Sequence, residues 1–318
     1  MSRQRPREGA LRGRRLRRPV GTYSIVGSDA AGSLGVAVQS HWFNVGAVVP
    51  WIEAGVGAVV VQSISDPATG ERALDRLRSG SSASAALAAV LDGDEHAGYR
   101  QIAIVDANRG VATHTGELCI AEAGHSVGEG FSAQANIMAR ATVWGAMAEA
   151  FDRSGGDLAE RLLAALDAAE AEGGDLRGRQ SAALIVVPSD ADGATFDLRV
   201  EDAPDPLSEL RRIVSLQRAY RELNRGDAMM ARGEFETALG AYERAARLVP
   251  DEATGGEAAF WAGVAFATTG RPDRAVAFLG RAADVDERWT RLLPRLVECK
   301  LFPDDPALLD RLLDAMRR

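Results

Sequence analysis

The C-terminal third of this sequence repeats itself. Residues 226–250 align with residues 263–286 at one offset of 37 positions. Small residues recur at five matched places, where two helices would have to cross closely. The matched pairs are Gly226/Gly263, Ala228/Ala265, Gly233/Gly270, Ala238/Ala275 and Ala245/Ala282. The repeat therefore predicts stacked helix pairs in this part of the chain.

This repeat resembles the tetratricopeptide pattern, including the proline at its end, Pro250. About three repeats are usually needed for an independent stack, so we expect these two to pack on the rest of the chain or to pair between subunits. The leucine-rich residues 289–318 are typical of capping helices. The resemblance implies a protein or peptide partner for the repeats, and a homo-oligomer.

A different pattern occupies the preceding part of the chain from Thr22 onward. Short β-branched runs bounded by Gly, Ser and Asp predict strands. These runs are 22–27, 34–39, 45–49, 57–62, 101–106, 111–115, 131–136, 181–187 and 195–200, and the first four are expected to form one antiparallel unit. Helical spacing predicts two helices within 67–94, with Ser82 as the N-cap of the second, and two more at 143–153 and 158–172, ended by Gly173-Gly174.

The order of these blocks constrains the fold. Strand block, helix pair, strand block, helix pair and strand pair is the order expected when two sheets pack face to face with helices outside. We therefore predict an α+β protein, an αββα sandwich followed by an all-α helical domain. Pro204 and Pro206 mark the boundary. Three parts are expected: a disordered Arg-rich leader over 1–21, the sandwich over 22–204 and the helical repeats over 205–318.

Charge and composition exclude several classes of function. The net charge is −8, but residues 1–21 hold eight arginines and one glutamate, so the remainder carries 29 basic and 44 acidic residues, a net charge of −15. An acidic body argues against nucleic acid as a partner. No run of 18 apolar residues predicts a membrane span, and no apolar segment follows the arginines as in a secretory signal, so we expect a cytoplasmic protein.

Motifs for bound groups are absent from the sequence. Cys119 and Cys299 lie far apart and lack the spacing of a zinc site or a disulfide framework. There is no Walker loop, no dinucleotide fingerprint and no HExxH sequence. We therefore expect no cofactor and no metal.

Six segments carry a resemblance to a known family. They are TYSIVGSD, GVAVQSHWFNVGAVVPWIEAGVGAVVVQS, RQIAIVDANRGVATHTG, SAQANIM, GGDLRGRQSAALIVV and FDLRVEDAPDPLSELRR. Together they resemble domain of unknown function 1028, over about residues 22–214. That family is grouped with the N-terminal nucleophile (Ntn) hydrolases, αββα sandwiches whose first residue is the nucleophile. Its members commonly open with Met-Thr, which makes Thr22 the implied nucleophile, although 21 residues precede it here.

The chemistry of such a site explains why Thr22 would have to be the first residue. A threonine hydroxyl attacks well only when a base takes its proton, and a free α-amino group on the same residue supplies that base. The Gly21-Thr22 junction resembles the one that proteasome β-subunits cut in themselves, so the leader is compatible with self-processing. The alternative is that Thr22 simply begins a strand, where threonine is favoured.

Partner residues follow from their positions near strand ends. Asn136 could donate a hydrogen bond to an oxyanion or be a structural amide, and Ser40 would lie near Thr22 if the first hairpin forms. In segment 177–182, Arg179, Gln180 and Ser181 could project into the site. Arg179 could bind a substrate carboxylate or form an internal ion pair.

Two further residues belong to the candidate substrate site. Asp175 could hold one of the side chains of segment 177–182. His114, in the alternating run VATHTG, could carry a proton or be a satisfied sheet histidine. His41 stands where members of the family tend to carry a basic residue such as lysine.

These features predict an Ntn-type amidohydrolase that uses Thr22 on a small amide-containing metabolite. The alternative is a non-catalytic αββα module for binding or assembly, whose repeats recruit peptides. A third reading is a small-molecule enzyme whose site does not use Thr22. Fold resemblance alone does not decide between them.

Overall fold

The computed structural model describes residues 18–189 and 196–318, which belong to two compact units. The first unit ends at Arg211 and the second runs from Arg212 to Arg318. The molecule is a mixed α+β protein with antiparallel sheets and a helical C-terminal region. The leader predicted over 1–21 lies outside the described residues except for 18–21.

The first unit contains a six-stranded antiparallel sheet whose centre is the N-terminal hairpin. Its strands are β1 (Thr22–Ser28), β2 (Leu34–Ser40), β7 (Gly124–Gly128), β8 (Phe131–Asn136), β9 (Ser181–Val187) and β10 (Phe196–Val200). The order across the sheet is β10-β9-β2-β1-β8-β7. β1 therefore pairs with β2 on one side and with β8 on the other, which puts the C-terminal ends of both neighbours beside Thr22.

A four-stranded antiparallel sheet faces the first one. It consists of β3 (Pro50–Glu53), β4 (Gly57–Ser63), β5 (Arg100–Asp106) and β6 (Val111–Thr115), in that order. One apolar cluster joins the inner faces of both sheets and includes Val26, Val36, Val38, Val60, Ala103 and Val105. Burial of this layer out of water holds the two sheets together.

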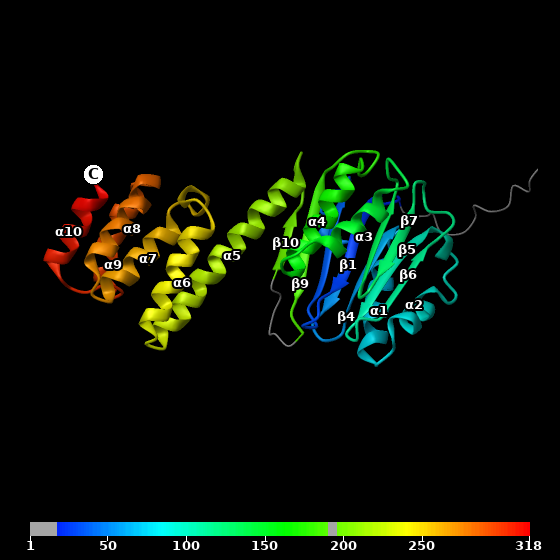
Figure 1. Cartoon of the computed structure of the whole chain (residues 1–318), viewed down its shortest axis with the longest axis horizontal. Coiled ribbons are helices and arrows are strands. Elements are labelled where there is room, and N and C mark those ends of the chain that lie inside the picture. The colour runs from blue at the N-terminus through cyan, green and yellow to red at the C-terminus, as the bar shows by residue number, and fades with distance from the viewer. Residues whose placement is uncertain (1–17, 190–195) are drawn as a thin grey trace, which may run out of the picture. The chain divides into compact units, whose positions relative to one another are not determined.

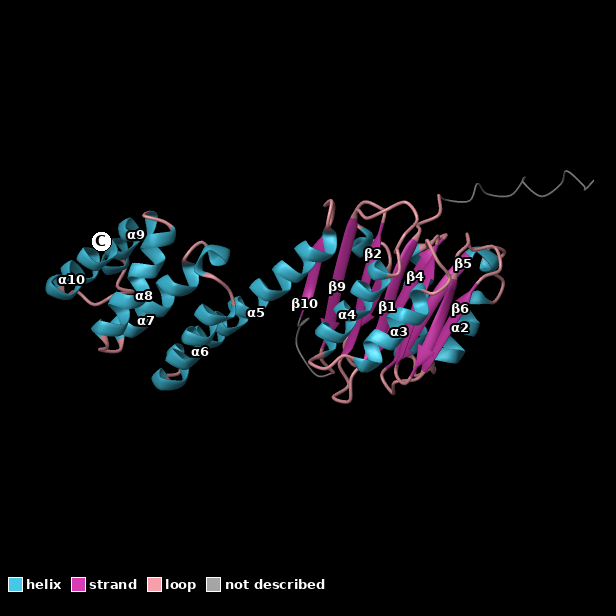
Figure 2. Ribbon diagram, turned by 45° about the horizontal axis from the view of Figure 1, so that its top comes forward, coloured by secondary structure: helices cyan, strands magenta, loops and turns pink. Residues whose placement is uncertain are grey.

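Helices cover the outer faces of both sheets (Figures 1 and 2). α1 (Pro67–Arg78) and α2 (Ala83–Leu91) pack against β4 and β5 through an apolar cluster that includes Leu74, Leu87 and Ile104. α3 (Val143–Arg153) and α4 (Leu158–Ala171) cover the six-stranded sheet, where Phe151 packs on Phe131 at 4.5 Å between ring centroids. The Ser82 side chain accepts from the backbone of Ala85, as predicted for an N-cap.

Two sequence predictions about the first unit are wrong, and two strands were missed. Residues 45–49 are not a strand: Asn44 is left-handed (φ 50°), and the chain turns through a short 3-10 helix, η1 (Val45–Ala47), before β3. The first four strands do not form one unit, because β1 and β2 belong to the six-stranded sheet, and β3 and β4 to the four-stranded sheet. Neither β3 nor β7 was predicted. The start of the predicted strand at Thr195 lies outside the described residues.

The second unit consists of helices. α5 (Pro206–Ala231) begins in the first unit and continues into the second, followed by α6 (Phe235–Leu248), α7 (Glu257–Thr268), α8 (Pro272–Val285), α9 (Arg288–Glu298) and α10 (Pro306–Met316). Both bounds of α8 lie 37 positions after those of α6. Gly233 and Gly270, which precede these helices, have φ of 76° and 77°, a left-handed backbone that favours glycine. Two short 3-10 helices, η2 (Ala97–Tyr99) and η3 (Asp251–Thr254), complete the structure of the described residues.

Among the described residues, none of the helices has the length and apolar character needed to cross a membrane.

Candidate functional site

Thr22 begins the central strand and is fully buried. Its register partners are Ser40 at the end of β2 and Asn136 at the end of β8, both also fully buried. Paired residues on neighbouring strands point to the same face of a sheet. Three of the predicted site residues therefore meet at one edge of the layer between the sheets.

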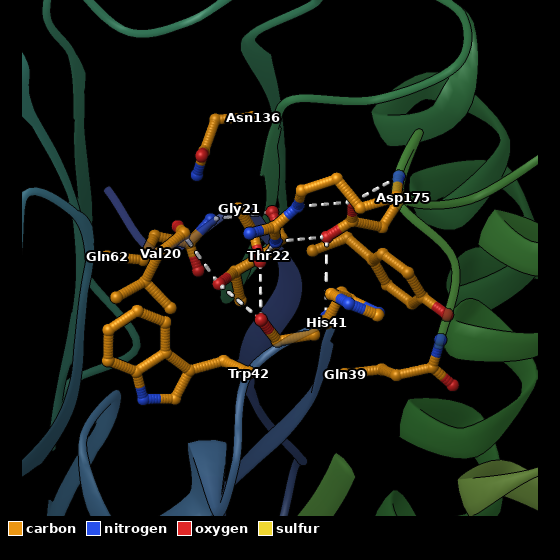
Figure 3. A network of polar contacts seen from close by, with 12 residues as sticks. Val20, Gly21, Thr22, Gln39, His41, Trp42, Gln62, Asn136 and Asp175 are labelled. Atoms are coloured by element: carbon orange, nitrogen blue, oxygen red, sulfur yellow. Dashed lines mark hydrogen bonds and ion pairs between the residues drawn. The ribbon is translucent and has the colours of Figure 1, made fainter. Parts of the chain in front are cut away.

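The Ser40 hydroxyl links the Thr22 hydroxyl to the carbonyl oxygen of Gly21 (Figure 3). Thr22 Oγ1 can donate to the carbonyl oxygen of Val20 (3.2 Å) or to Ser40 Oγ (3.4 Å). The Gly21 carbonyl oxygen accepts two hydrogen bonds, one from Ser40 Oγ and one from Arg177 Nη2 (2.8 Å). Two donors thus polarise the carbonyl that precedes Thr22.

Arg177 owes its position to Asp175. The two carboxylate oxygens of Asp175 accept from Nε (3.0 Å) and Nη2 (2.7 Å) of Arg177, a bidentate ion pair. The Asp175 side chain is completely buried and also accepts from the backbone N–H groups of Arg177 (2.9 Å) and His41 (3.4 Å). A buried carboxylate with these donors fixes the guanidinium plane toward Gly21.

Buried amides extend from Thr22 into the layer between the sheets. Gln62 Nε2 donates to Gln101 Oε1 (2.7 Å) and lies 3.4 Å from the Thr22 carbonyl oxygen. Asn136 Nδ2 also donates to Gln101 Oε1 (2.9 Å), and Ser24 Oγ donates to Gln62 Oε1 (2.7 Å). In the described part of the chain, Asn136 Oδ1 has no partner. The Asn136 amide nitrogen therefore faces Gln101 and not the Gly21 carbonyl.

A second network lies on the opposite face of the same sheet, toward α4. Glu170 accepts from the Tyr23 hydroxyl (2.5 Å) and from Gln39 Nε2 (2.7 Å), and its other oxygen pairs with Arg179 Nε (2.9 Å). Burial raises the pKa of Tyr23, and the Glu170 carboxylate raises it further. Arg179 also pairs with Asp205 (3.2 Å). Of its two predicted roles, the structure places Arg179 in an internal ion pair.

The remaining predicted residues do not reach the Thr22 hydroxyl. Ser181 is paired with Ser40, but its hydroxyl donates to the Trp42 carbonyl oxygen and accepts from the Val45 N–H. Gln180 Nε2 donates to Asp202 (3.1 Å). His114 lies on the four-stranded sheet with Nε2 at 2.8 Å from the carbonyl oxygen of Ala97.

Sequence reasoning missed Arg177 and Gln62. The segment RGR offers two arginines, and only the location of Asp175 decides which of them faces Thr22. Gln62 stands among valines in β4, so it reads as the end of a strand. A polar residue in a buried apolar run was the available signal, because buried amides are usually hydrogen-bonded.

No group of three or more His, Cys, Asp or Glu side chains in residues 18–189 and 196–318 is arranged to hold a metal ion. The site can instead supply a hydroxyl, a polarised carbonyl and fixed hydrogen-bond donors.

Comparisons with known proteins identify relatives of the first unit. The model of the family of unknown function DUF1028 matches residues 22–210. The crystal structure of protein SPO2555 from Silicibacter pomeroyi, described as family-model DUF1028, is similar with a TM-score of 0.57 and 31% sequence identity, covering 61% of this chain and 88% of that chain. Among curated proteins, none matches.

Proposed function

This chain belongs to the DUF1028 family, and on that premise we propose that its first unit is an Ntn hydrolase-like αββα sandwich, an amidohydrolase that acts on a small amide-containing metabolite. Thr22 is the nucleophile in this proposal. The order of helix layer, two sheets and helix layer supports it, as does the position of Thr22 at the start of the central strand.

The observation that carries the proposal is that the Gly21 carbonyl accepts from two donors, Ser40 Oγ and Arg177 Nη2, and that the Thr22 hydroxyl contacts the first of them. When Thr22 Oγ1 adds to the Gly21 carbonyl carbon, negative charge develops on the carbonyl oxygen, where Ser40 Oγ and Arg177 Nη2 already point. Donors that are fixed before the reaction stabilise such charge without reorganisation. Ser40 and Arg177 therefore form the oxyanion site of the proposed enzyme.

Self-cleavage would give Thr22 the free α-amino group that its catalytic role requires. The Gly21–Thr22 C–N bond breaks, the hydroxyl proton passes to the departing nitrogen and an ester joins Gly21 to Thr22 Oγ1. Water then hydrolyses this ester, which leaves a free Thr22 α-amine and a free hydroxyl. The amine, with a pKa of about 8, can take the hydroxyl proton when a separate amide substrate binds.

Intact-mass spectrometry tests the proposal on the full-length chain. We expect the wild-type protein to lose residues 1–21 during incubation, and Thr22→Ala to stay whole because it lacks the hydroxyl. Thr22→Ser is the matched control, since it keeps a hydroxyl and should still be cut. A wild-type chain that stays as whole as Thr22→Ala would contradict the proposal.

One observation favours a second candidate, a non-catalytic binding or assembly module. Thr22 is fully buried, and Val20 beside it is held to Ser63 by a backbone hydrogen bond of 2.8 Å. In such a module residues 18–21 would be a permanent part of the fold. The same mass experiment decides, because this candidate requires an uncut wild-type chain.

We further propose that the helical unit is tetratricopeptide-like and binds a protein or peptide partner or a second copy of the chain, in the cytoplasm. The shared 37-residue spacing of α6 and α8 supports this, as do two close helix crossings at glycine. A Cβ on Gly226 would meet the Tyr242 ring at 2.8 Å, and one on Gly263 would meet Leu279 at 2.6 Å. Sedimentation velocity of the full-length chain tests self-association, and a monomer at all concentrations would exclude it.

A further inference from the structure

We infer that the proposed enzyme has an acyl subsite for an apolar residue followed by glycine, and that its substrates are amides with such a peptidic acyl group. This inference rests on the proposed role of Thr22. It starts from the way in which the structure holds Val20 and Gly21, the two residues before the nucleophile.

Position 21 has no room for a side chain. A Cβ on Gly21 would lie 2.4 Å from Arg177 Nη2, 2.8 Å from Arg177 Cζ and 2.9 Å from Ile137 Cδ1. The guanidinium is the movable end of its side chain, but Asp175 holds it on two oxygens and it also binds the Gly21 carbonyl. Moving it away would break the contacts that polarise that carbonyl. The subsite therefore selects glycine, whose α-carbon bears no side chain.

The Ile137 backbone on the other side of the subsite is fixed. Ile137 is 8% exposed and has φ of 61°, a backbone conformation that a β-branched residue rarely adopts. Its carbonyl oxygen accepts from the N–H of Leu176, and its own N–H donates to Ile120. These bonds tie both neighbouring loops to Ile137 and fix its backbone beside Gly21, so only rotation of the end of its side chain could make room for a Cβ.

Val20 occupies a buried apolar position. Its exposed fraction is 3%, and its N–H donates to the carbonyl oxygen of Ser63 in an isolated antiparallel bridge. Ser63 ends β4 with φ of 65°, which is unusual for a residue other than glycine and aims its carbonyl at Val20. The bridge recognises an extended peptide backbone, and the burial of the Val20 side chain favours an apolar residue there.

The same acyl subsite is used in both self-cleavage and substrate hydrolysis, because each reaction passes through an ester of Thr22 Oγ1. In self-cleavage the acyl group that ends in Val20-Gly21 is transferred from the Thr22 nitrogen to Thr22 Oγ1. In turnover, Oγ1 attacks a substrate carbonyl, the amide C–N bond breaks, the leaving amine takes a proton, and an acyl group is again esterified to Oγ1. Water releases it as a carboxylic acid in both cases. The subsite that holds Val20-Gly21 in the ester of self-cleavage therefore accepts a similar acyl group in the ester formed from a substrate.

The first measurement is the rate of self-cleavage in the full-length chain. We expect Gly21→Ala to slow the loss of residues 1–21 by roughly tenfold or more, because the added methyl displaces Arg177 from the carbonyl. Val20→Asp should slow it comparably, since a carboxylate would be buried without a partner. Gly145→Ala is the matched control: a Cβ there meets nothing within 4 Å, and its rate should equal that of the wild type.

The second measurement does not depend on the folding of a variant. The self-cleaved wild-type protein is given acetyl-Val-Gly 4-nitroanilide and acetyl-Val-Ala 4-nitroanilide, and we expect the glycyl amide to be hydrolysed at least roughly tenfold faster. Equal rates, or hydrolysis of neither compound, would overturn the subsite.

The outcomes separate the two proposals. A wild-type chain that is never cut removes the proposed function itself. A wild-type chain that is cut, together with Gly21→Ala cut at the same rate, leaves Thr22 as the nucleophile and overturns only the acyl subsite.

Discussion

At the scale of single residues, two arginines that stand two positions apart have different surroundings. Arg177 donates to the Gly21 carbonyl, whereas Arg179 pairs with Glu170 on the opposite face of the sheet. Removal of one oxyanion donor costs about 10²–10³ in rate in comparable sites. We therefore expect Arg177→Ala to slow self-cleavage by about two orders of magnitude, measured by intact mass, and Arg179→Ala to leave it unchanged. Equal rates for the two variants would show that Arg177 does not stabilise the oxyanion.

At the scale of the helices, two glycines should respond to alanine in opposite directions. Gly263 lies in α7, where a Cβ would meet the Leu279 side chain of α8 at 2.6 Å, so Gly263→Ala should destabilise the protein by about 1–3 kcal/mol. Gly240 lies in α6, where a Cβ would meet only the end of the Arg244 side chain at 3.4 Å. Gly240→Ala should stabilise by about 0.5–1 kcal/mol, because glycine is costly inside a helix. Urea unfolding followed by circular dichroism measures both. A Gly263→Ala variant as stable as the wild type, or more stable, would contradict close packing at Gly263.

The elements that sequence reasoning found are those with an unambiguous pattern. β6, β8 and β9 have the predicted bounds, because β6 and β9 are rich in β-branched or apolar residues and β8 alternates apolar with polar residues. β7 was missed because Gly124–Gly128 (GHSVG) has glycine at both ends and only one apolar residue, so its pairing with β8 has little local signal. Residues 45–49 have the pattern of a strand but contain a short 3-10 helix that packs on β9. The packing there is close, because a Cβ on Gly46 would meet Ala183 at 2.6 Å.

The candidate site was predictable in part for the same reason. Thr22 and Ser40 stand opposite each other because the predicted hairpin pairs their strands. Asn136 was recognisable only as the end of a strand, because the pairing of β8 with β1 joins segments far apart in the sequence. Asp175 and Arg177 lie in the loop between α4 and β9, where no periodicity indicates direction. The contact of Arg177 with Gly21 is a tertiary contact between segments far apart in the sequence. The spacing of residues along the sequence does not predict it.

At the scale of the whole molecule, the proposed cleavage after Gly21 would change the net charge. Residues 1–21 carry eight arginines and one glutamate, so their loss takes the net charge from −8 to −15. A more acidic protein binds an anion exchanger more strongly. We expect the wild type to elute at higher salt after incubation than before it, and Thr22→Ala to keep its position. A wild type whose elution does not change while its mass falls would contradict this charge balance.

The burial of Thr22 beneath its own preceding residues has a kinetic consequence. The hydroxyl and the Gly21 carbonyl belong to one chain and are enclosed together, so the proposed self-cleavage is a unimolecular event. Its half-life would not change when the protein is diluted, and an added amide could not compete for the hydroxyl before the leader departs. Each molecule would thus become active once, in a first-order step. The time at which hydrolysis of a substrate begins would not depend on the protein concentration.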